Sequence, residues 1–475
     1  MTTGTAALWS PPPLDFGVTP KNPVLQTSKV DSSRDFGVTP KSPVPQRADV
    51  VIVGGGFTGL WTAYYLLRAR PELQVVVLEA EHVGFGASGR NGGWVSALWP
   101  VSPDRIAARH GRAAALAMLA ELRHTVDEVG EVCRHEGIDA GFHKGGTLVL
   151  ARGPAQEARA RAYAGHGASW ENDTIWLGPE QTAERLPGAG PLNGATFTPH
   201  CARIHPRRLV DGLAEAVVRL GGIVIEGTRV QDIQPGTVTT NSADTIRAQS
   251  IVRATEAWTP RLPSSRRAIA PVYSLMVATE PLSDEHWSRI GLADNEVFSD
   301  HGHVIIYGQR TVDGRIAFGG RGAPYHYASD IKASYDHDEQ VFSRLREELH
   351  RLLPALGDVR FTHAWGGPLG IARDWHPSVG YDSSSGLGWA GGYVGDGVAA
   401  TNLAGRTLAA LITGKDDPIT VLPWVGHRSP SWEPEPMRWL GVNAGLRLAE
   451  WADAEERRSR RPARIGPLVD RFTGH

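Results

Sequence analysis

The sequence contains too little cysteine to build a stabilised or metal-binding framework. Among its 475 residues only Cys133 and Cys201 are cysteines. Two thiols cannot supply a disulfide framework of the kind that small secreted domains use, and they cannot form a cysteine-based metal site. We therefore predict no metal centre of that type.

The chain also lacks long apolar runs and any strong excess of charge. No stretch approaches the ~20 apolar residues that a membrane-spanning helix needs, and the N-terminus has neither the basic nor the apolar region of a secretory signal. The net charge is −2 and the pI is about 6.8, which gives no reason to expect nucleic acid or an anionic membrane as a partner. These absences predict a cytoplasmic protein.

Residues 1–46 differ in composition from the rest of the chain. They are rich in proline, serine and threonine, and Asp15–Lys21 (DFGVTPK) recurs as Asp35–Lys41. Two copies are too few for a repeat architecture. We predict a flexible extension with a duplicated segment; the alternative is a pair of short docking motifs.

A βαβ unit follows this extension. Asp49–Val53 is an apolar, β-branched run that ends in glycines; a helix-period segment continues to Pro71, and a second apolar run, Gln74–Leu78, ends at Glu79. Strand, helix, strand and acid in this order are typical of a dinucleotide-binding unit.

Each glycine of this unit has a predicted role. Gly54 permits a tight turn, Gly56 lets the backbone approach a pyrophosphate, and Gly59 lets the helix pack on its strand, so that the diphosphate meets the helix N-terminus at Phe57 and Thr58. Glu79 can accept hydrogen bonds from a ribose diol.

A second glycine-rich loop occupies residues 84–94. So many glycines imply that the backbone passes close to a flat or phosphorylated group, and the polar side chains among them can donate to phosphate or ring oxygens. A nicotinamide-binding domain would not need this second loop. The predicted contact residues here are Ala87, Ser88, Arg90, Asn91, Gly92 and Gly93.

Together, the two glycine loops and Glu79 resemble the FAD-binding front end of the D-amino-acid oxidase-like (DAO) superfamily. Within it, the second loop is most similar to the gamma-glutamylputrescine oxidoreductase and glycine/sarcosine oxidase branches. The resemblance covers most of residues 47–427. It implies an α/β fold, with a Rossmann-like FAD-binding domain of the glutathione-reductase type and an α+β substrate domain built on an antiparallel sheet.

The resemblance also implies how the chain is divided. Residues 47–100, 205–270 and 360–427 would form the FAD-binding domain, and residues 101–204 and 271–359 the substrate-binding domain. Residues 428–475 contain Trp432, Trp439 and Trp451 before an arginine-rich end. We expect a C-terminal helical tail packed on the main body; a basic amphipathic membrane anchor is the alternative.

Further cofactor contacts are implied by the same resemblance. The backbone at Val230 would contact the adenine, and Thr255 belongs to a segment that closes such domains, although Glu256 stands where the family has glycine. A late glycine loop opens a predicted helix, Val398–Ile412, whose N-terminus would face the pyrimidine edge of the flavin and stabilise its reduced anion. Its implied contact residues are Gly392, Tyr393, Gly395, Asp396, Gly397 and Val398.

The substrate side is less clearly marked. Alternating runs on either side of Asp313-Gly314 predict a β-hairpin, which the family places over the flavin. The polar and aromatic side chains predicted to face the substrate cavity, and so to be catalytic candidates, are Tyr307, Arg321, Tyr325 and His326.

Departures from the family pattern bear on the substrate and the cofactor. Leu369 stands where amino-acid-oxidising relatives carry an arginine that binds the substrate carboxylate through two N–H groups. Leucine has no such donors. Arg321 or Arg373 could compensate. Ala317 falls roughly where some sarcosine-oxidising relatives place an oxygen-activating lysine. The C-terminal half has no cysteine and residues 84–94 have no histidine, so we predict non-covalent FAD.

The sequence thus predicts an FAD-dependent enzyme that removes hydride from a C–H bond beside nitrogen in a primary or secondary amine. The imine would hydrolyse to an aldehyde, and dioxygen or an electron-transfer partner would reoxidise the flavin. An α-amino-acid or N-methyl amino-acid oxidase or dehydrogenase is one alternative, and a non-catalytic flavin-binding assembly protein is the other. An oligomer is possible.

Overall fold

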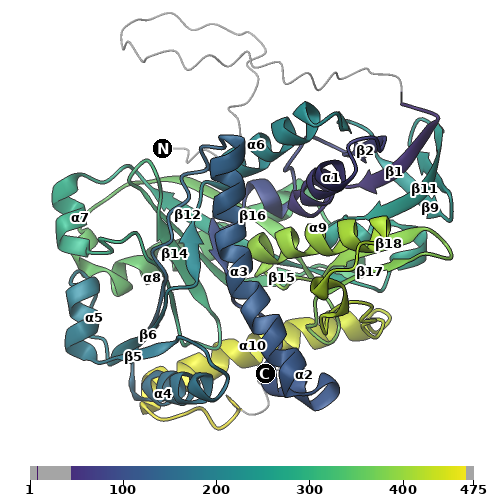
Figure 1. The fold of residues 1–475 in the computed structure, drawn as a ribbon. Coiled ribbons are helices and arrows are strands. Elements are labelled where there is room, and N and C mark those ends of the chain that lie inside the picture. Colours follow the sequence, from purple (N-terminus) through teal and green to yellow (C-terminus); the bar gives the residue numbers. More distant parts are fainter. Residues whose placement is uncertain (1–7, 9–43, 467–475) are drawn as a thin grey trace, which may run out of the picture.

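The computed structural model describes Leu8 and residues 44–466. The duplicated DFGVTPK segment lies outside these residues. Two eight-stranded sheets form two adjoining lobes, with the long helix α3 (Arg112–Glu136) running between them in Figure 1. No helix among the described residues is long and apolar enough to cross a membrane.

The first lobe is built on a mostly parallel sheet. Its central strand β1 pairs in parallel with β2 and β11, while β18 continues the sheet beyond β11 and β8 beyond β2. All four residues of β2 are buried, as expected for a parallel strand covered on both faces. The strands are β1 (Arg47–Val53), β2 (Val75–Leu78), β8 (Ile223–Ile225), β9 (Val230–Gln234), β10 (Thr237–Thr240), β11 (Thr245–Arg253), β17 (Ser378–Asp382) and β18 (Leu387–Gly391).

Helices cover this sheet and enclose the largest apolar core of the described residues. α1 (Phe57–Ala69) packs beside α9 (Gly397–Thr413), and α6 (Pro206–Arg219) and α3 complete the layer. α9 confirms the predicted helix and ends at Gly414, whose left-handed conformation is typical of a helix C-terminus. The core includes Leu60, Trp61 and Leu403, all fully buried.

The second lobe is built on a mainly antiparallel sheet, in the order β16-β12-β15-β14-β13-β4-β6-β5. The hairpin predicted around Asp313-Gly314 is confirmed as β14 and β15. β16 begins inside the segment expected for the FAD-binding domain, yet it pairs along its length with β12. The strands are β4 (Thr147–Ala151), β5 (Ile175–Leu177), β6 (Gly194–Thr198), β12 (Ala270–Thr279), β13 (Val297–Asp300), β14 (Ile306–Arg310), β15 (Ile316–Tyr325) and β16 (Phe361–Ile371).

Short helices and one small sheet complete the molecule. α8 packs on β12 and β15 and buries Phe342 and Leu349 in the core of the second lobe. β3 (Trp94–Ser96) pairs with β7 (Cys201–Arg203) in a two-stranded sheet. The remaining helices are α2 (Pro103–His110), α4 (Pro154–Ser169), α5 (Pro179–Arg185), α7 (Asp284–Ile290), α8 (Glu339–Leu352) and α10 (Met437–Ser459).

Candidate active site

The first glycine loop leaves no room for side chains. A Cβ atom on Gly59 would overlap the carbonyl oxygen of Gly54, and one on Gly56 would lie 2.8 Å from Oγ of Ser88. Gly54 has φ +116° and sits against the carbonyl of Ala254. The turn therefore brings the N-terminus of α1 within reach of a ligand's phosphates, because backbone N–H groups and the helix dipole point outward from it.

Glu79 holds this turn from the end of β2. Its Oε2 accepts the backbone N–H of Gly55 at 2.7 Å and its Oε1 that of Glu81 at 3.0 Å. Burial raises the pKa of Glu79, although these backbone hydrogen bonds act in the opposite direction. The carboxyl group is thus fixed beside the glycine turn, where the sequence placed the ribose contact.

The second loop is folded partly onto itself. Ser88 Oγ accepts the N–H of Phe57 at 2.8 Å, which joins this loop to the start of α1. The Asn91 amide donates to the carbonyls of Ala87 and Ser88 at 3.1 and 3.0 Å, and its oxygen accepts from the N–H of Gly93. Asn91 therefore shapes the loop from within.

Arg90 and Gly92 connect this loop to the second lobe. Arg90 Nη1 lies 2.8 Å from Oδ2 of Asp336 and 3.2 Å from the carbonyl of Gly366. The carbonyl of Gly92 accepts from Nε2 of Gln309 at 2.8 Å. The loop thus lies at the boundary between the two sheets.

The late glycine loop closes the same region from the C-terminal part of the chain. Tyr393 is buried, and its hydroxyl lies 3.1 Å from Oγ1 of Thr58 on α1. Asp396 precedes α9 without a side-chain capping bond to that helix, and Gly395 and Val394 both have positive φ angles. The N-termini of α1 and α9 are thereby brought side by side.

The structural role of Glu256 was not predicted from the sequence. Its backbone is left-handed, with φ 40°, a conformation that glycine adopts more readily. Its buried carboxylate accepts the N–H of Gly392 at 2.9 Å and of Tyr393 at 3.4 Å. A Cβ on Gly370 would lie 2.6 Å from Oε1, so small neighbours make room for this side chain.

The electrostatic environment of Glu256 is unusual. Burial raises its pKa to about 7 against the lowering effect of hydrogen bonds from Gly392, Tyr393 and Gly370 and of the charge on Arg253. Nη1 of Arg253 is buried without a hydrogen-bond partner among the described residues. A residue at the family's glycine position thus holds the late loop in place and titrates near neutral pH.

One face of the second sheet looks toward the second glycine loop. Met276, Ala278, Ala317 and Trp365 form a buried apolar cluster, against which Tyr307 packs. Leu8, from the N-terminal extension, packs there too. Nε1 of Trp365 donates to the carbonyl of Arg90 at 2.9 Å, so the cluster is joined to the loop.

Tyr307 is the predicted substrate-side residue that the structure brings closest to this loop. A Cβ on Gly92 would lie 2.9 Å from Cε2 of Tyr307, and the Tyr307 hydroxyl lies 2.8 Å from Oγ of Ser274. Trp94 meets the Tyr307 ring edge-on, with centroids 6.2 Å apart.

The other predicted substrate-side residues have different surroundings. The hydroxyl of Tyr325 donates to Glu435 at 2.7 Å, near the C-terminal tail. His326 stacks on Tyr335 at a centroid separation of 3.4 Å and meets Tyr273 edge-on. Arg321 is placed by its strand register, opposite Ser274. The four predicted residues therefore do not form one cluster.

The predicted adenine contact, Val230, and Thr255 of the segment that closes such domains both lie near the ends of strands. Val230 is the first residue of β9 and packs against a second, smaller apolar cluster on the first sheet. The hydroxyl of Thr255 lies 2.9 Å from that of Thr259. Neither position contradicts a role near the cofactor.

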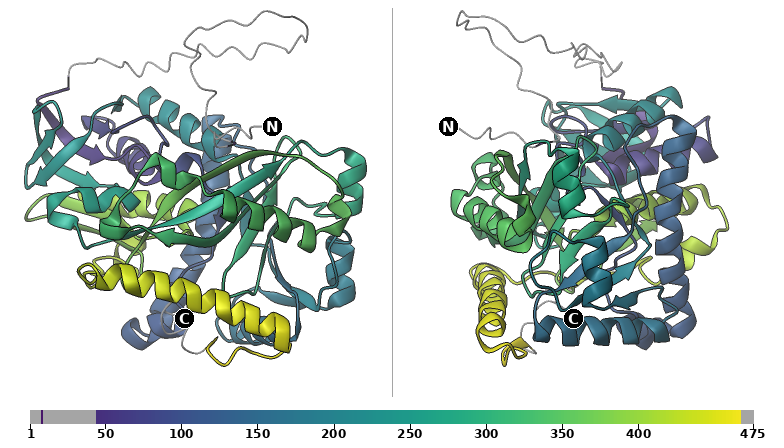
Figure 2. Two further views of the ribbon diagram at one scale, coloured as in Figure 1. Left: turned by 180° about the vertical axis from the view of Figure 1, so that it is seen from behind. Right: turned by 90° about the vertical axis from the view of Figure 1, so that its left-hand side faces the viewer.

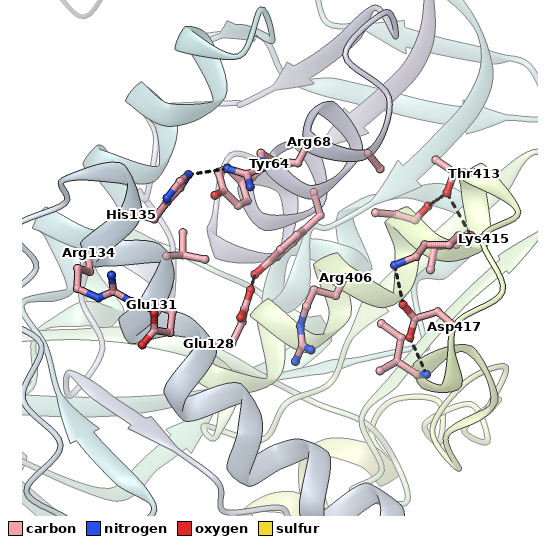
Figure 3. A pocket seen from close by; sticks show the side chains of 16 residues that line it. Tyr64, Arg68, Glu128, Glu131, Arg134, His135, Arg406, Thr413, Lys415 and Asp417 are labelled. Atoms are coloured by element: carbon pink, nitrogen blue, oxygen red, sulfur yellow. Dashed lines mark hydrogen bonds and ion pairs between the residues drawn. The ribbon is translucent and has the colours of Figure 1, made fainter.

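A separate polar groove of about 590 Å³ opens between α1, α3 and α9. Figure 3 shows Tyr64 and Arg68 on one wall and Arg406 on another. These residues come from the second halves of α1 and α9, away from the helix N-termini. The charged side chains there pair with one another, as Lys415 does with Asp417 at 3.0 Å, and we do not assign the cofactor to this groove.

Comparison with known proteins identifies the family. The family of FAD dependent oxidoreductases named DAO matches residues 49–411. This chain is a member of that family. The "probable oxidoreductase OrdL" of Rhizobium meliloti is 30% identical over 382 residues, which cover 79% of this chain and 86% of that protein.

Other relatives agree with the predicted branch. The gamma-glutamylputrescine oxidoreductase of Escherichia coli is 29% identical over 370 residues, 77% of this chain and 84% of that protein. The crystal structure of glycine oxidase from Geobacillus kaustophilus superposes with a TM-score of 0.68 at 23% identity, covering 82% of this chain and all of that one. The predicted recognition and fold class are confirmed.

The residues present suit FAD, the cofactor of this family. A Cβ atom at Gly54, Gly56 or Gly59 would collide with neighbouring protein atoms, so only glycines allow the tight turn that a diphosphate on a helix N-terminus requires. Nε1 of Trp94 and Oε1 of Gln309 are buried without hydrogen-bond partners among the described residues. Both side chains adjoin the second loop. The protein is an FAD-dependent oxidoreductase.

Proposed function

We propose that this protein oxidises a C–N bond of a primary or secondary amine. Bound FAD would accept a hydride from the carbon next to nitrogen, and the resulting imine would react with water to give an aldehyde and either ammonia, from a primary amine, or a smaller amine, from a secondary amine. The relatives named for gamma-glutamylputrescine, glycine and sarcosine support this reaction class.

The observation that carries the proposal is the apolar sheet face beside the second loop. Met276, Ala317 and Trp365 are buried there around Tyr307, and a surface of this kind excludes water and favours the neutral amine over the ammonium ion. A neutral amine is required because its nitrogen lone pair assists departure of the hydride. In this proposal Tyr307, held through its hydroxyl by Ser274, orients the substrate carbon.

The residues near the carboxylate position favour an amine over a free amino acid. Leu369 lies on β16 and offers no donor. Arg373 is engaged elsewhere, because its Nε lies 2.9 and 3.0 Å from the two carboxylate oxygens of Glu433. The second candidate, an α-amino-acid or N-methyl amino-acid oxidase or dehydrogenase, rests on Arg321, which pairs in register with Ser274.

Other residues bear on attachment and reoxidation of the cofactor. Cys133 and Cys201 are both buried, and burial raises the pKa of each thiol to about 12, which disfavours the reactive thiolate. We propose that FAD is bound without a covalent link. Ala317 supplies no amine beside the cluster, so we expect slow reaction with dioxygen and a preference for another electron acceptor.

Anaerobic reduction of the purified yellow protein tests the proposal. Primary and secondary amines should bleach the flavin absorbance, whereas free amino acids should do so at least tenfold more slowly (~1.4 kcal/mol in the barrier). Faster bleaching by amino acids, abolished in Arg321→Gln, would replace the proposal with the second candidate. Photoreduction without bleaching by any amine or amino acid would instead support a non-catalytic flavin-binding protein. Admitting air then measures the oxidase reaction.

A further inference from the structure

The C-terminal helix α10 packs on the body through charged residues. Its buried residues are Arg438, Ala449, Ala452, Asp453 and Glu456. A helix on a globular surface normally buries an apolar stripe and exposes its charges. α10 departs from this arrangement, because beside Ala449 and Ala452 it buries three charged side chains.

The two buried carboxylates of α10 are well paired. Glu456 receives Nη1 and Nη2 of Arg159 at 2.6 and 2.7 Å and lies 3.2 Å from Nε2 of His303. The carboxylate of Asp453 accepts the N–H groups of His303 and Val304 at 2.8 and 2.9 Å. These bonds fix the rotation of α10 about its axis, because turning the helix would leave several buried charges without partners.

The outer face of α10 exposes large apolar side chains. The exposed fractions are 57% for Met437, 55% for Leu440 and 63% for Trp451. With Ala444, these residues follow one another at intervals of three, four and seven positions, which places them on one side of the helix. Trp439, beside them, is 40% exposed. α10 lies along the outside of the molecule in both views of Figure 2.

An arginine run follows at the C-terminal end of α10. Arg457, Arg458, Arg460 and Arg461 are all exposed at the end of α10. An apolar stripe with tryptophans at its border, followed by clustered arginines, is typical of helices that lie in the plane of an anionic lipid surface. Guanidinium groups pair there with headgroup phosphates, and each adds about fivefold to the affinity.

We propose that the outer face of α10 docks the protein on an anionic lipid surface. Met437, Leu440 and Trp451 enter the boundary between headgroups and acyl chains, and the four arginines contact the phosphates. A single helix presents a convex ridge, to which lipids conform without a preformed groove, whereas a protein partner would need a complementary groove. This proposal revises the sequence-based expectation of no membrane partner and is independent of the proposed reaction.

Vesicle co-sedimentation of the full-length, FAD-loaded protein tests the docking. The protein should sediment with vesicles containing phosphatidylglycerol, bind pure phosphatidylcholine at least tenfold more weakly, and be released by high salt. Equal binding to both vesicle types, or binding to neither, would overturn the proposal.

Two sets of variants separate the apolar and the charged contributions. The double variant Leu440→Ser/Trp451→Ser should weaken binding more than about tenfold, since two large apolar side chains no longer enter the lipid. Arg457→Gln/Arg458→Gln/Arg460→Gln/Arg461→Gln should weaken it by about six hundredfold, that is about fivefold for each arginine, and remove the salt dependence. The FAD content of each variant shows whether it is folded.

Matched controls lie elsewhere on the surface. Val421→Ser removes an apolar side chain that is 83% exposed outside α10, and Arg47→Gln/Arg247→Gln removes two exposed arginines of the first sheet. Both should bind vesicles as the parent does; a loss equal to that of the α10 variants would overturn the proposal. A dimer that Leu440→Ser/Trp451→Ser dissociates, without vesicle binding by the parent, would assign the face to a second copy and overturn the lipid proposal.

Discussion

The two eight-stranded sheets offer different chemical surfaces to a ligand. At the first sheet the proposed contacts come from backbone groups around Gly54 and Gly59, where no side chain fits. At the second sheet they come from side chains, among them Tyr307, Met276 and Trp365. Adding one Cβ atom to the backbone-made site should abolish cofactor binding. Replacing one side chain of the other site should reduce its function only in part.

The largest effect is expected from Gly59→Val. The added side chain would overlap the carbonyl of Gly54, so the turn cannot form and the protein should retain no FAD. The flavin absorbance of the purified protein measures this. Gly165→Ala, at a position where a Cβ meets nothing within 4 Å, is the control and should keep its flavin; normal flavin content in Gly59→Val would contradict the assignment of the diphosphate site.

Glu256→Gln tests a side chain that holds the late glycine loop beside the backbone-made site. Burial raises the pKa of Glu256 from 4.5 to about 7. Below pH ~4.5 the carboxyl is neutral in both states; between pH ~4.5 and ~7 the unfolded chain loses its proton first, so the free energy of unfolding falls as pH rises, by about 3 kcal/mol. Glutamine cannot titrate, so this part of the pH dependence should disappear.

Urea unfolding between pH 5 and 8 measures the difference between Glu256→Gln and the parent. Glu347→Gln, on the exposed face of α8, should keep the parent's profile. Parallel profiles for the parent and Glu256→Gln would show that Glu256 does not titrate in this range.

Arg90 tests the connection between the two kinds of surface. Its ion pair with Asp336 joins the second loop to the second lobe across half-buried surroundings. Arg90→Met should weaken FAD binding by about tenfold to hundredfold, equivalent to ~1–3 kcal/mol. Fluorescence titration with FAD measures the affinity. Adding Asp336→Asn to Arg90→Met should weaken FAD binding little further, because the ion pair is already lost. If the effects of the two substitutions were fully additive, direct coupling between Arg90 and Asp336 would be excluded.

The smallest effect is expected from Tyr307→Phe. Loss of the hydroxyl bond to Ser274 should slow flavin reduction by about threefold to tenfold, or ~1 kcal/mol, with little change in stability. Tyr325→Phe is its counterpart: it loses a buried bond to Glu435 and should lower the melting temperature while leaving reduction unchanged. Stopped-flow absorbance and thermal unfolding distinguish them, and identical behaviour of the two variants would contradict the assignment of Tyr307.

Local pattern predicts the first lobe well. The glycine spacing, the apolar run before Gly54 and the acid at Glu79 each depend on neighbours within about one βαβ unit, and the structure shows the expected strands and helix. The hairpin at Asp313-Gly314 was predicted equally well, because the residues that determine a turn are neighbours in the sequence.

Contacts between residues far apart in the chain could not be predicted, because they do not depend on local sequence pattern. Glu256 acquires its role only when Gly370 and Gly392 meet it, more than a hundred residues away. The pairing of β12 with β15 shifts register between Val272 and Ser274. Such a bulge changes which residues share a face, and strand alternation alone could not place Tyr325 and His326.

The bond between Thr58 and Tyr393 spans 335 residues. It joins a helix to a loop that is translated 335 residues later, and β18, the neighbour of β11, is translated shortly before that loop. A nascent chain released before about residue 390 would therefore display half of a nucleotide site and an uncovered parallel sheet. We therefore expect FAD to bind only after this loop has been translated, and until then the unfinished first lobe exposes surfaces that favour aggregation.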